Sequence, residues 1–184
     1  MSNAPRKEVL SKFWEWLTHQ TPQRQIIGMA AQHASLAGSR KCECLPLTWQ
    51  QVDRKKNEVR VFRGKRRKGR PETVDVVSIS PDMAALLHRL QAIRPDRECA
   101  QMVPTSVGNE YSARGFKSLW QKCVVAAIKT GTLLAEDRFT FHDLRAFYAR
   151  TDKKQDGALP SKHANPETTA RVYNRNIEVK RRSL

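Results

Sequence analysis

The sequence lacks any long apolar run. No segment approaches the roughly 20 apolar residues that a helix needs to cross a bilayer. The N-terminus also lacks the apolar stretch and small-residue cleavage site of a secretory signal peptide. These absences predict a cytoplasmic protein that neither spans a membrane nor is exported.

Cysteines are few and poorly spaced for disulfides or metal. The four are Cys42, Cys44, Cys99 and Cys123. Without an export signal they do not form a disulfide framework. Cys42 and Cys44 form a lone C-x-C motif without a second pair at zinc-ligand spacing. We therefore expect reduced cysteines, no metal site and no cofactor.

Acidic residues are also scarce. The chain has 18 Asp and Glu residues against 34 Lys and Arg, which gives a net charge of +16. Such an excess favours a polyanionic partner, and nucleic acid fits best. A ribosomal protein, or a soluble protein that is merely basic, is the alternative. A membrane surface fits less well, because no basic amphipathic helix stands out.

The pattern of apolar residues predicts one mostly helical domain over residues 5–184, of the α+β class, with a small antiparallel β-sheet. Its 184 residues, 39% of them hydrophobic, suffice for a sizeable core. Periodicity and capping residues predict helices over 5–19, 22–37, 40–45, from Ser80 to before Pro95, 112–130, 141–151 and 165–173. Two strands are expected at 59–63 and 73–79, joined by a very basic hairpin loop over 64–71.

Several residues suit phosphate chemistry, although each alone also has a plain interpretation. Arg40 follows Gly38 at a predicted helix start, where backbone N–H groups favour an anion, but it also fits a solvated surface arginine. His142 and Arg145 are three residues apart and would share a helix face, a spacing that also arises by chance. Lys65 belongs to a charged loop, and a lone tyrosine such as Tyr173 usually packs.

In combination these residues resemble the signature of the tyrosine recombinase (phage integrase) family. The segment from Ala37 to Asp53 is similar to the family's first arginine box, with Arg40, Glu43, Trp49 and Asp53 in register. The basic hairpin follows where the family carries its lysine, and Lys65 fits that place. His142-Asp143-Leu144-Arg145 resembles the second box. The segment from His163 to Tyr173 resembles the ending, with Thr168 and Thr169 before the tyrosine.

The resemblance implies site-specific DNA recombination, the integration or excision of a mobile element, by transesterification through a 3′-phosphotyrosine without metal. Tyr173 would be the nucleophile and Lys65 would protonate the leaving oxygen. Arg40 and Arg145 would hold the phosphate oxygens, and His142 and His163 would assist. We expect Glu43 to support Arg40 rather than to react, and Tyr148 and Tyr111 are the competing tyrosines. The residues expected to bind DNA phosphates are Arg63, Arg66, Arg67, Arg70, Lys117 and Lys122.

The chain departs from the family pattern in two places. His163 follows Arg145 by only 18 positions, and Ser161-Lys162-His163 replaces the family's common Leu-Gly-His, so we expect a shortened helix there. The N-terminal DNA-clamping domain usual in the family has no counterpart before Lys7. The family implies double-stranded DNA as partner and a homotetramer on DNA that exchanges C-terminal segments. In isolation the domain is expected to be a monomer.

Three other functions remain open at this stage. A catalytically idle relative would bind DNA without cutting it. A type IB topoisomerase-like enzyme would use the same nucleophile to relax supercoils. An RNA-binding structural protein would explain the charge but not the four ordered motifs.

Overall fold

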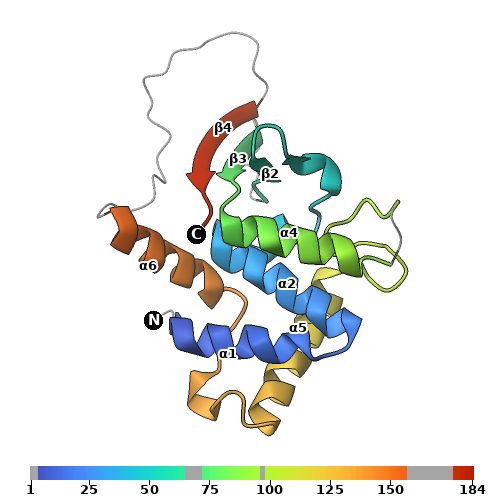
Figure 1. Cartoon of the computed structure of the whole chain (residues 1–184), viewed down its shortest axis with the longest axis vertical. Helices are drawn as coiled ribbons and strands as arrows, with labels where there is room; N and C mark the ends of the chain where they lie inside the picture. Colours follow the sequence, from blue (N-terminus) through green and yellow to red (C-terminus); the bar gives the residue numbers. More distant parts are fainter. Residues whose placement is uncertain (1–3, 65–71, 96–97, 157–175) are drawn as a thin grey trace.

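Helix α2 (Pro22–Ala37) forms the centre of the fold, with the other long helices packed around it (Figure 1). The computed structural model describes residues 4–64, 72–95, 98–156 and 176–184. Around α2 lie α1 (Lys7–Thr18), α4 (Pro81–Ile93), α5 (Ala113–Lys129) and α6 (Asp143–Asp156). Pro22 occupies the first turn of α2, where its missing N–H costs nothing.

Small side chains allow α2 to be covered from several sides. Ala30, Ala31, Ala34 and Ala37 are all fully buried. Because alanine has only a methyl group, neighbouring helices approach the α2 backbone closely. Gly28 allows a still closer approach of α1, since a Cβ at this position would lie 2.5 Å from Cδ1 of Leu17.

A second part of the core is aromatic and joins α1 to α5 and the segment before α6. The ring of Phe13 makes edge contacts with Trp120 and Phe139, with centroids 5.7 and 5.6 Å apart. Trp120 also makes an edge contact with Phe141. Such edge-to-face pairs add to the hydrophobic gain from burying the rings. This cluster fixes the segment that leads into His142 and Arg145.

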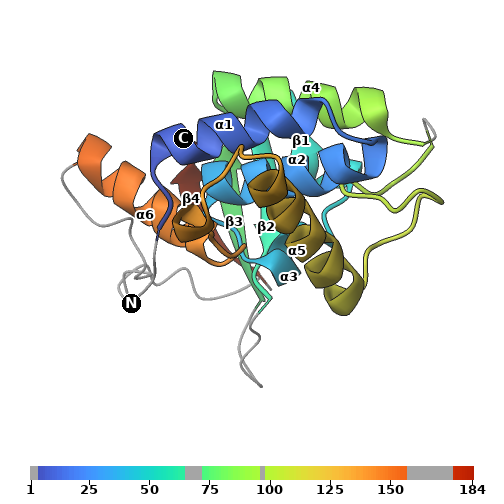
Figure 2. The same cartoon turned by 90° about the horizontal axis from the view of Figure 1, so that it is seen from below.

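The sheet has four strands in the order β1-β2-β3-β4 (Figures 1 and 2). They are β1 (Val52–Asp53), β2 (Glu58–Phe62), β3 (Glu72–Ser78) and β4 (Asn176–Arg182). Pairs β1/β2 and β2/β3 are antiparallel, whereas β4 runs parallel to β3. The expectation of a purely antiparallel sheet is therefore wrong. The sequence near β2 and β3 encodes only the local hairpin, and β4 returns from the far end of the chain.

Strand β4 was not predicted, because its sequence ends in three consecutive basic residues and has little apolar alternation. The two residues that follow β4 are nevertheless held in place by hydrogen bonds. Leu184 N–H donates to Leu36 O at 2.9 Å, and Ser80 N–H donates to the Ser183 hydroxyl at 2.7 Å. The C-terminal residues thus bind the end of α2 and the start of α4.

The predicted helix boundaries agree with the structure to within two residues, except at the C-terminal end of α6, which extends to Asp156 rather than Thr151. Helix α2 matches its predicted range, and Gly38 ends it in the left-handed conformation with φ of 66°. Helix α3 spans Lys41–Cys44, one residue shorter at each end than expected, and α6 begins at Asp143 rather than Phe141. At α6 the Asp143 carboxylate accepts the Thr140 N–H, so this first-turn aspartate defines the start. The expected helix over 165–173 lies outside the described residues.

None of the helices in the described ranges is both long and apolar enough to cross a bilayer.

One buried histidine should make the fold sensitive to acid. His33 on α2 is 1% exposed, and burial lowers its pKa to about 4 from an ordinary 6.5. Because the unfolded chain then binds the proton more readily, the free energy of unfolding is full above pH 6.5 and falls as the pH drops towards 4. This histidine alone should remove about 3 kcal/mol across that range. Urea unfolding at several pH values measures the slope.

The matched variants are His33→Leu and His88→Leu, the second at an exposed position on α4. We expect the first to flatten the dependence of stability on pH between 6.5 and 4 and the second to leave it nearly unchanged. Equal slopes in wild type and His33→Leu would mean that this imidazole is not the acid-sensitive group.

Candidate active site and nucleic-acid interface

The candidate site begins at the turn between α2 and α3, where Gly38 carries a positive φ. A Cβ at Gly38 would lie 2.5 Å from Cδ1 of the Tyr148 ring on α6. Only glycine therefore fits, for both its backbone conformation and its close approach to the ring. The turn directs the chain so that Arg40 precedes α3 with an extended backbone.

Glu43 holds Arg40 from within the first turn of α3. One carboxylate oxygen accepts the Arg40 N–H at 2.8 Å, and the other accepts Nη1 of its guanidinium at 2.7 Å. The Glu43 side chain is 1% exposed, and that of Arg40 is 33% exposed. The prediction that Glu43 supports Arg40 is confirmed by these contacts.

The Glu43 carboxylate remains ionised despite its burial. Burial by itself raises the pKa of this group, but two hydrogen bonds from Arg40 and the charges of Arg40 and Arg145 outweigh it and lower the pKa. An ionised carboxylate between two arginines fixes both side chains while leaving the cluster net positive.

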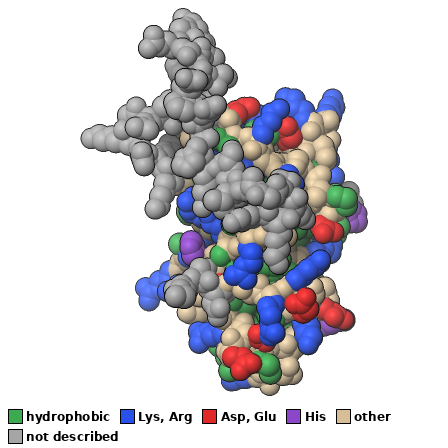
Figure 3. Space-filling view, turned by 90° about the vertical axis from the view of Figure 1, so that its left-hand side faces the viewer, with side chains coloured by type: hydrophobic (Ala, Val, Ile, Leu, Met, Phe, Trp, Pro, Cys, Tyr) green, Lys and Arg blue, Asp and Glu red, His purple; other side chains and the backbone are tan. Residues whose placement is uncertain are grey.

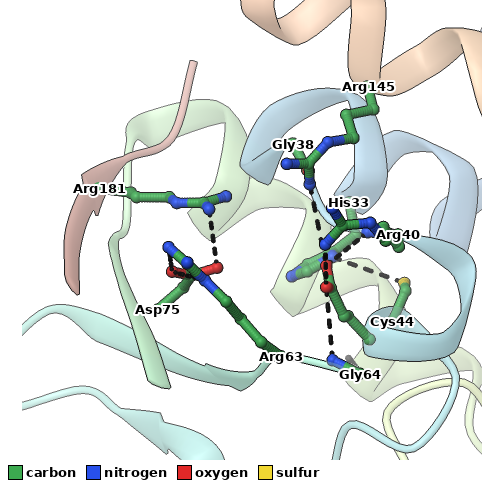
Figure 4. A network of polar contacts seen from close by, with 10 residues as sticks. His33, Gly38, Arg40, Cys44, Arg63, Gly64, Asp75, Arg145 and Arg181 are labelled. Carbon is green, nitrogen blue, oxygen red and sulfur yellow. Dashed lines mark hydrogen bonds and ion pairs between the residues drawn. The ribbon is translucent and has the colours of Figure 1, made fainter. Parts of the chain in front are cut away.

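Arg145 reaches the same carboxylate from α6. Its Nη1 donates to Gly38 O at 2.6 Å and lies 4.0 Å from the Glu43 carboxylate (Figure 4). Burial and the charges of Arg40 and Arg181 lower the pKa of Arg145, although an arginine remains charged at neutral pH. Residues 105 positions apart in the sequence therefore form one cationic cluster, as the motif comparison predicted.

A cavity of about 470 Å³ opens beside this cluster. Its lining combines cationic and polar side chains with apolar and aromatic ones. The cationic residues and histidine are Arg40, Lys41, Lys117, Arg138, His142 and Arg145, and the apolar and aromatic residues include Phe116, Trp120, Val124, Phe139 and Phe141. His142 is exposed and lies just before α6 rather than on it, and both His142 and Arg145 line this cavity.

Two of the three tyrosines in the chain are buried. Tyr148 donates its hydroxyl to Arg182 O at 2.8 Å, and burial raises its pKa to about 12. Burial also raises the pKa of Tyr111, which is 5% exposed. Neither hydroxyl is placed to react with a large substrate. Tyr173 lies outside the described residues.

A second carboxylate holds two more arginines next to the first cluster. The Asp75 carboxylate on β3 accepts a hydrogen bond from Nε of Arg63 at 2.9 Å and forms an ion pair with Nη2 of Arg181 at 3.0 Å. Its side chain is 3% exposed. Arg63 was predicted from the sequence, whereas Asp75 and Arg181 were not. A usable signal was present, because an aspartate within the apolar run from Val74 to Val77 needs a buried cationic partner.

The other predicted DNA-binding residues fall into two groups. Lys117 and Lys122 are both exposed on α5, but only Lys117 lines the cavity. Five residues turn a helix by about 500°, so the two lysines lie on different faces. The remaining candidates, Lys65, Arg66, Arg67, Arg70, His163 and Tyr173, lie outside the described residues.

Lys and Arg side chains are spread over the face shown in Figure 3 and outnumber Asp and Glu there.

The described ranges contain no group of three or more His, Cys, Asp or Glu residues that could hold a metal ion. Within the C-x-C motif, the buried Cys44 donates its thiol to Ala30 O, whereas Cys42 is exposed.

The chain has the fold of the tyrosine recombinase catalytic domain. Its structure is similar to the lambda integrase catalytic core, with a TM-score of 0.62, 18% identity and 85% of each chain covered. It also matches residues 82–397 of the Tn1549 transposon integrase in complex with circular intermediate DNA, with a TM-score of 0.62 and 16% identity. A third match is the XerH site-specific recombinase bound to palindromic difH, with a TM-score of 0.60 and 15% identity.

The two DNA-bound structures are longer than this chain. Each match covers 85% of this chain, but only 55% of the Tn1549 integrase chain and 44% of the XerH chain. The chain thus spans about half of these proteins. No protein-family model matches the sequence, and no curated protein does.

Replacing Glu43 by Gln should destabilise the protein. The amide keeps the shape but removes the charge that two arginines share, so we expect a loss of about 2 kcal/mol at neutral pH by urea unfolding. Because the pKa of Glu43 is lowered, its contribution is present above the ordinary pKa of 4.5 and is lost as the pH falls through the folded value. The difference between wild type and variant should therefore shrink in acid.

Glu8→Gln, at an exposed position on α1, is the control and should change the free energy of unfolding by less than about 0.5 kcal/mol. A loss in Glu43→Gln no larger than in this control would contradict the anchoring role of the carboxylate.

Gly38→Ala should cost more than a glycine substitution elsewhere with the same backbone conformation. Gly131 has φ of 74° with open space around its Cα, so Gly131→Ala isolates the left-handed penalty of about 1 kcal/mol. At Gly38 the methyl group also collides with Tyr148, and we expect a total of about 3 kcal/mol. Thermal and urea unfolding of both variants measure the difference. Equal losses would mean that the ring moves aside freely.

Proposed function

We propose that this chain cleaves and rejoins DNA strands by the chemistry of a tyrosine recombinase. The observation that carries the proposal is the arrangement of Arg40, Arg145 and His142 beside one cavity, with both arginines fixed on the buried Glu43. The similarity to integrase and recombinase structures supports it. In its specific form the reaction is site-specific integration or excision of a mobile element.

The two arginines suit the transition state of phosphoryl transfer. That state spreads negative charge over the non-bridging oxygens, and guanidinium groups bind such oxygens with two parallel N–H donors. Because Glu43 and Gly38 O already fix the side chains, little reorganisation is needed when charge develops. Arg40 is one-third exposed, which leaves part of its guanidinium accessible to a phosphate.

Tyr173 is the proposed nucleophile. Its position in the sequence matches the family ending, and the other two tyrosines are buried in the core. Its phenol oxygen would attack the scissile phosphorus while the bond from phosphorus to the 5′-oxygen breaks. The products are a 3′-phosphotyrosyl protein and a DNA strand with a free 5′-hydroxyl. The phosphodiester energy is kept in the new bond, so a 5′-hydroxyl from a second strand can reverse the step.

Proton transfer would fall to the remaining motif residues. Lys65 would protonate the leaving 5′-oxygen. His142, which is exposed and lines the cavity, would accept the tyrosine proton or donate a hydrogen bond to the phosphate, and His163 would add a further hydrogen bond. In this scheme the charge on the phosphate is offset entirely by side chains of the chain.

The proposed partner is double-stranded DNA, bound chiefly through its phosphates. A net charge of +16 and the cationic side chains that line the cavity support a steep dependence of affinity on salt. We propose Lys117 as a phosphate contact beside the active site, with Lys122 and the hairpin arginines Arg66, Arg67 and Arg70 further along the DNA. Such an enzyme would work on DNA in the cytoplasm of a bacterial host.

The proposed assembly is a homotetramer on DNA and a monomer in isolation. In the structure β4 pairs with β3 of its own chain over seven residues. Asn176, the first residue of β4, follows Tyr173 by three positions. A C-terminal segment exchanged between subunits would therefore connect the nucleophile of one subunit with the sheet of another.

Tyr173→Phe should abolish covalent attachment to DNA while leaving DNA affinity within about two-fold of wild type, because the change removes the attacking oxygen alone. The substrate is a nicked duplex whose short cut fragment diffuses away, so that the covalent complex accumulates. A denaturing gel counts the adduct, and mass spectrometry locates the modified tyrosine.

Tyr148→Phe is the matched control and should still form the adduct, although it loses the hydrogen bond to Arg182 O. An adduct on Tyr148 or Tyr111 would overturn the assignment of the nucleophile. Tight DNA binding without any adduct, on a range of integrase substrates, would favour the idle DNA-binding relative. Relaxation of supercoiled plasmid without strand exchange would favour the topoisomerase-like enzyme.

A further inference from the structure

Asp75 gathers two arginines that come from opposite sides of its own strand. Val61 on β2 and Val179 on β4 are the direct neighbours of Asp75. Arg63 lies two residues beyond Val61, and Arg181 lies two residues beyond Val179, so both are diagonal neighbours on the same face of the sheet. Long side chains reach across such diagonals, and both guanidinium groups end at the Asp75 carboxylate (Figure 4).

The arrangement repeats that of the first cluster. Glu43 is 1% exposed and lies between Arg40 and Arg145, while Asp75 is 3% exposed and lies between Arg63 and Arg181. In each cluster one buried carboxylate faces two arginines, so each cluster keeps one net positive charge. A carboxylate needs only one arginine for neutrality. The second arginine adds a charge that burial makes costly unless an anion is bound nearby.

The arginines of the second cluster keep donors for such an anion. A guanidinium has five N–H groups. The contacts with Asp75 use Nε and Nη2 of Arg63 and only Nη2 of Arg181. The Arg63 side chain is 26% exposed and that of Arg181 is 14% exposed, so both groups are accessible in part.

The two clusters are close enough to act on each other. The charge of Arg181 lowers the pKa of Arg145 and that of Asp75 raises it. Figure 4 shows Arg145 and Arg181 directed towards the same space, between β3 and the turn at Gly38. Four guanidinium charges therefore surround two carboxylate charges, which leaves a net charge of two on adjacent elements.

We infer that Arg63 and Arg181 form a second phosphate-binding subsite, which takes a backbone phosphate next to the one held by Arg40 and Arg145. The inference rests on the proposed function, because it assigns the ligand as a DNA strand. Successive phosphates along one strand present repeated negative charge, and two carboxylate-anchored arginine pairs side by side match that repetition. Arg181 thus brings the last strand of the chain, β4, into contact with the substrate.

The test is the salt dependence of binding to a duplex of about 30 base pairs, measured by fluorescence anisotropy at several salt concentrations. Each phosphate contact contributes about 0.9 to the slope of log affinity against log salt concentration. We expect Arg181→Gln and Arg63→Gln each to reduce that slope by about 0.9. Arg181→Lys should restore it, because an ammonium still neutralises a phosphate.

The matched control is Arg60→Gln. Arg60 is an arginine of the same sheet, paired with Glu178 on the face opposite Asp75, and its removal should leave the slope unchanged. An arginine that only holds Asp75 in place would alter thermal stability without altering the slope. An unchanged slope in folded Arg181→Gln and Arg63→Gln would overturn the inference.

A second comparison applies if Arg181→Gln does not fold. Asp75→Asn removes the buried charge, so the double variant Asp75→Asn, Arg181→Gln is compared with Asp75→Asn alone. A slope lower by about 0.9 in the double variant supports the subsite, and equal slopes overturn it. The adduct assay on Tyr173 is independent of these slopes, so loss of the subsite and loss of the proposed chemistry are separate results. A wild-type chain without affinity for DNA would overturn the subsite.

Discussion

The site depends on the contacts that the buried Glu43 carboxylate makes with Arg40 and Arg145. It lies in a helix of four residues, α3, which is too short to be stable alone. The carboxylate accepts two hydrogen bonds from Arg40 and lies 4.0 Å from Arg145, so it joins the α2–α3 turn to α6. Gly38 makes this geometry accessible by ending α2 in a left-handed turn. Removal of this one charge would leave two arginines close together without their common counterion.

The sheet contains a second buried carboxylate, Asp75, which is also paired with two arginines. Asp75 is buried between the valines of β3, and the cost of burying its charge is offset because Arg63 and Arg181 reach it from both sides of the strand. Arg181 belongs to β4, which also receives the Tyr148 hydroxyl at Arg182 O. Docking of the C-terminal strand, packing of α6 and placement of cationic side chains are therefore coupled. A change in any one of these three features would therefore alter the other two.

Much of the fold was predictable because it is encoded locally. Proline in the first turn and glycine after the last gave the range of α2, and the two strands that flank the basic loop were found to within one residue. Strand β4 was missed because its pairing partner lies about 100 residues away and its own composition is basic. The sheet was expected to be antiparallel for the same reason. The local sequence of a strand does not specify which distant segment it pairs with or in which direction.

The sequence by itself determined the charge of the protein and the residue types of its first cluster. Arg40, Glu43, His142 and Arg145 stand at motif spacings, and in the structure Glu43 contacts both arginines while His142 lines the same cavity. Only the tertiary structure decided that the Tyr148 hydroxyl donates to Arg182 O and that Arg181 joins Asp75 and Arg63. The physical reason is that burial and ion pairing depend on which distant elements meet. A sequence specifies the side chains, but the environment that makes them ionised, buried or accessible is formed by the folded chain.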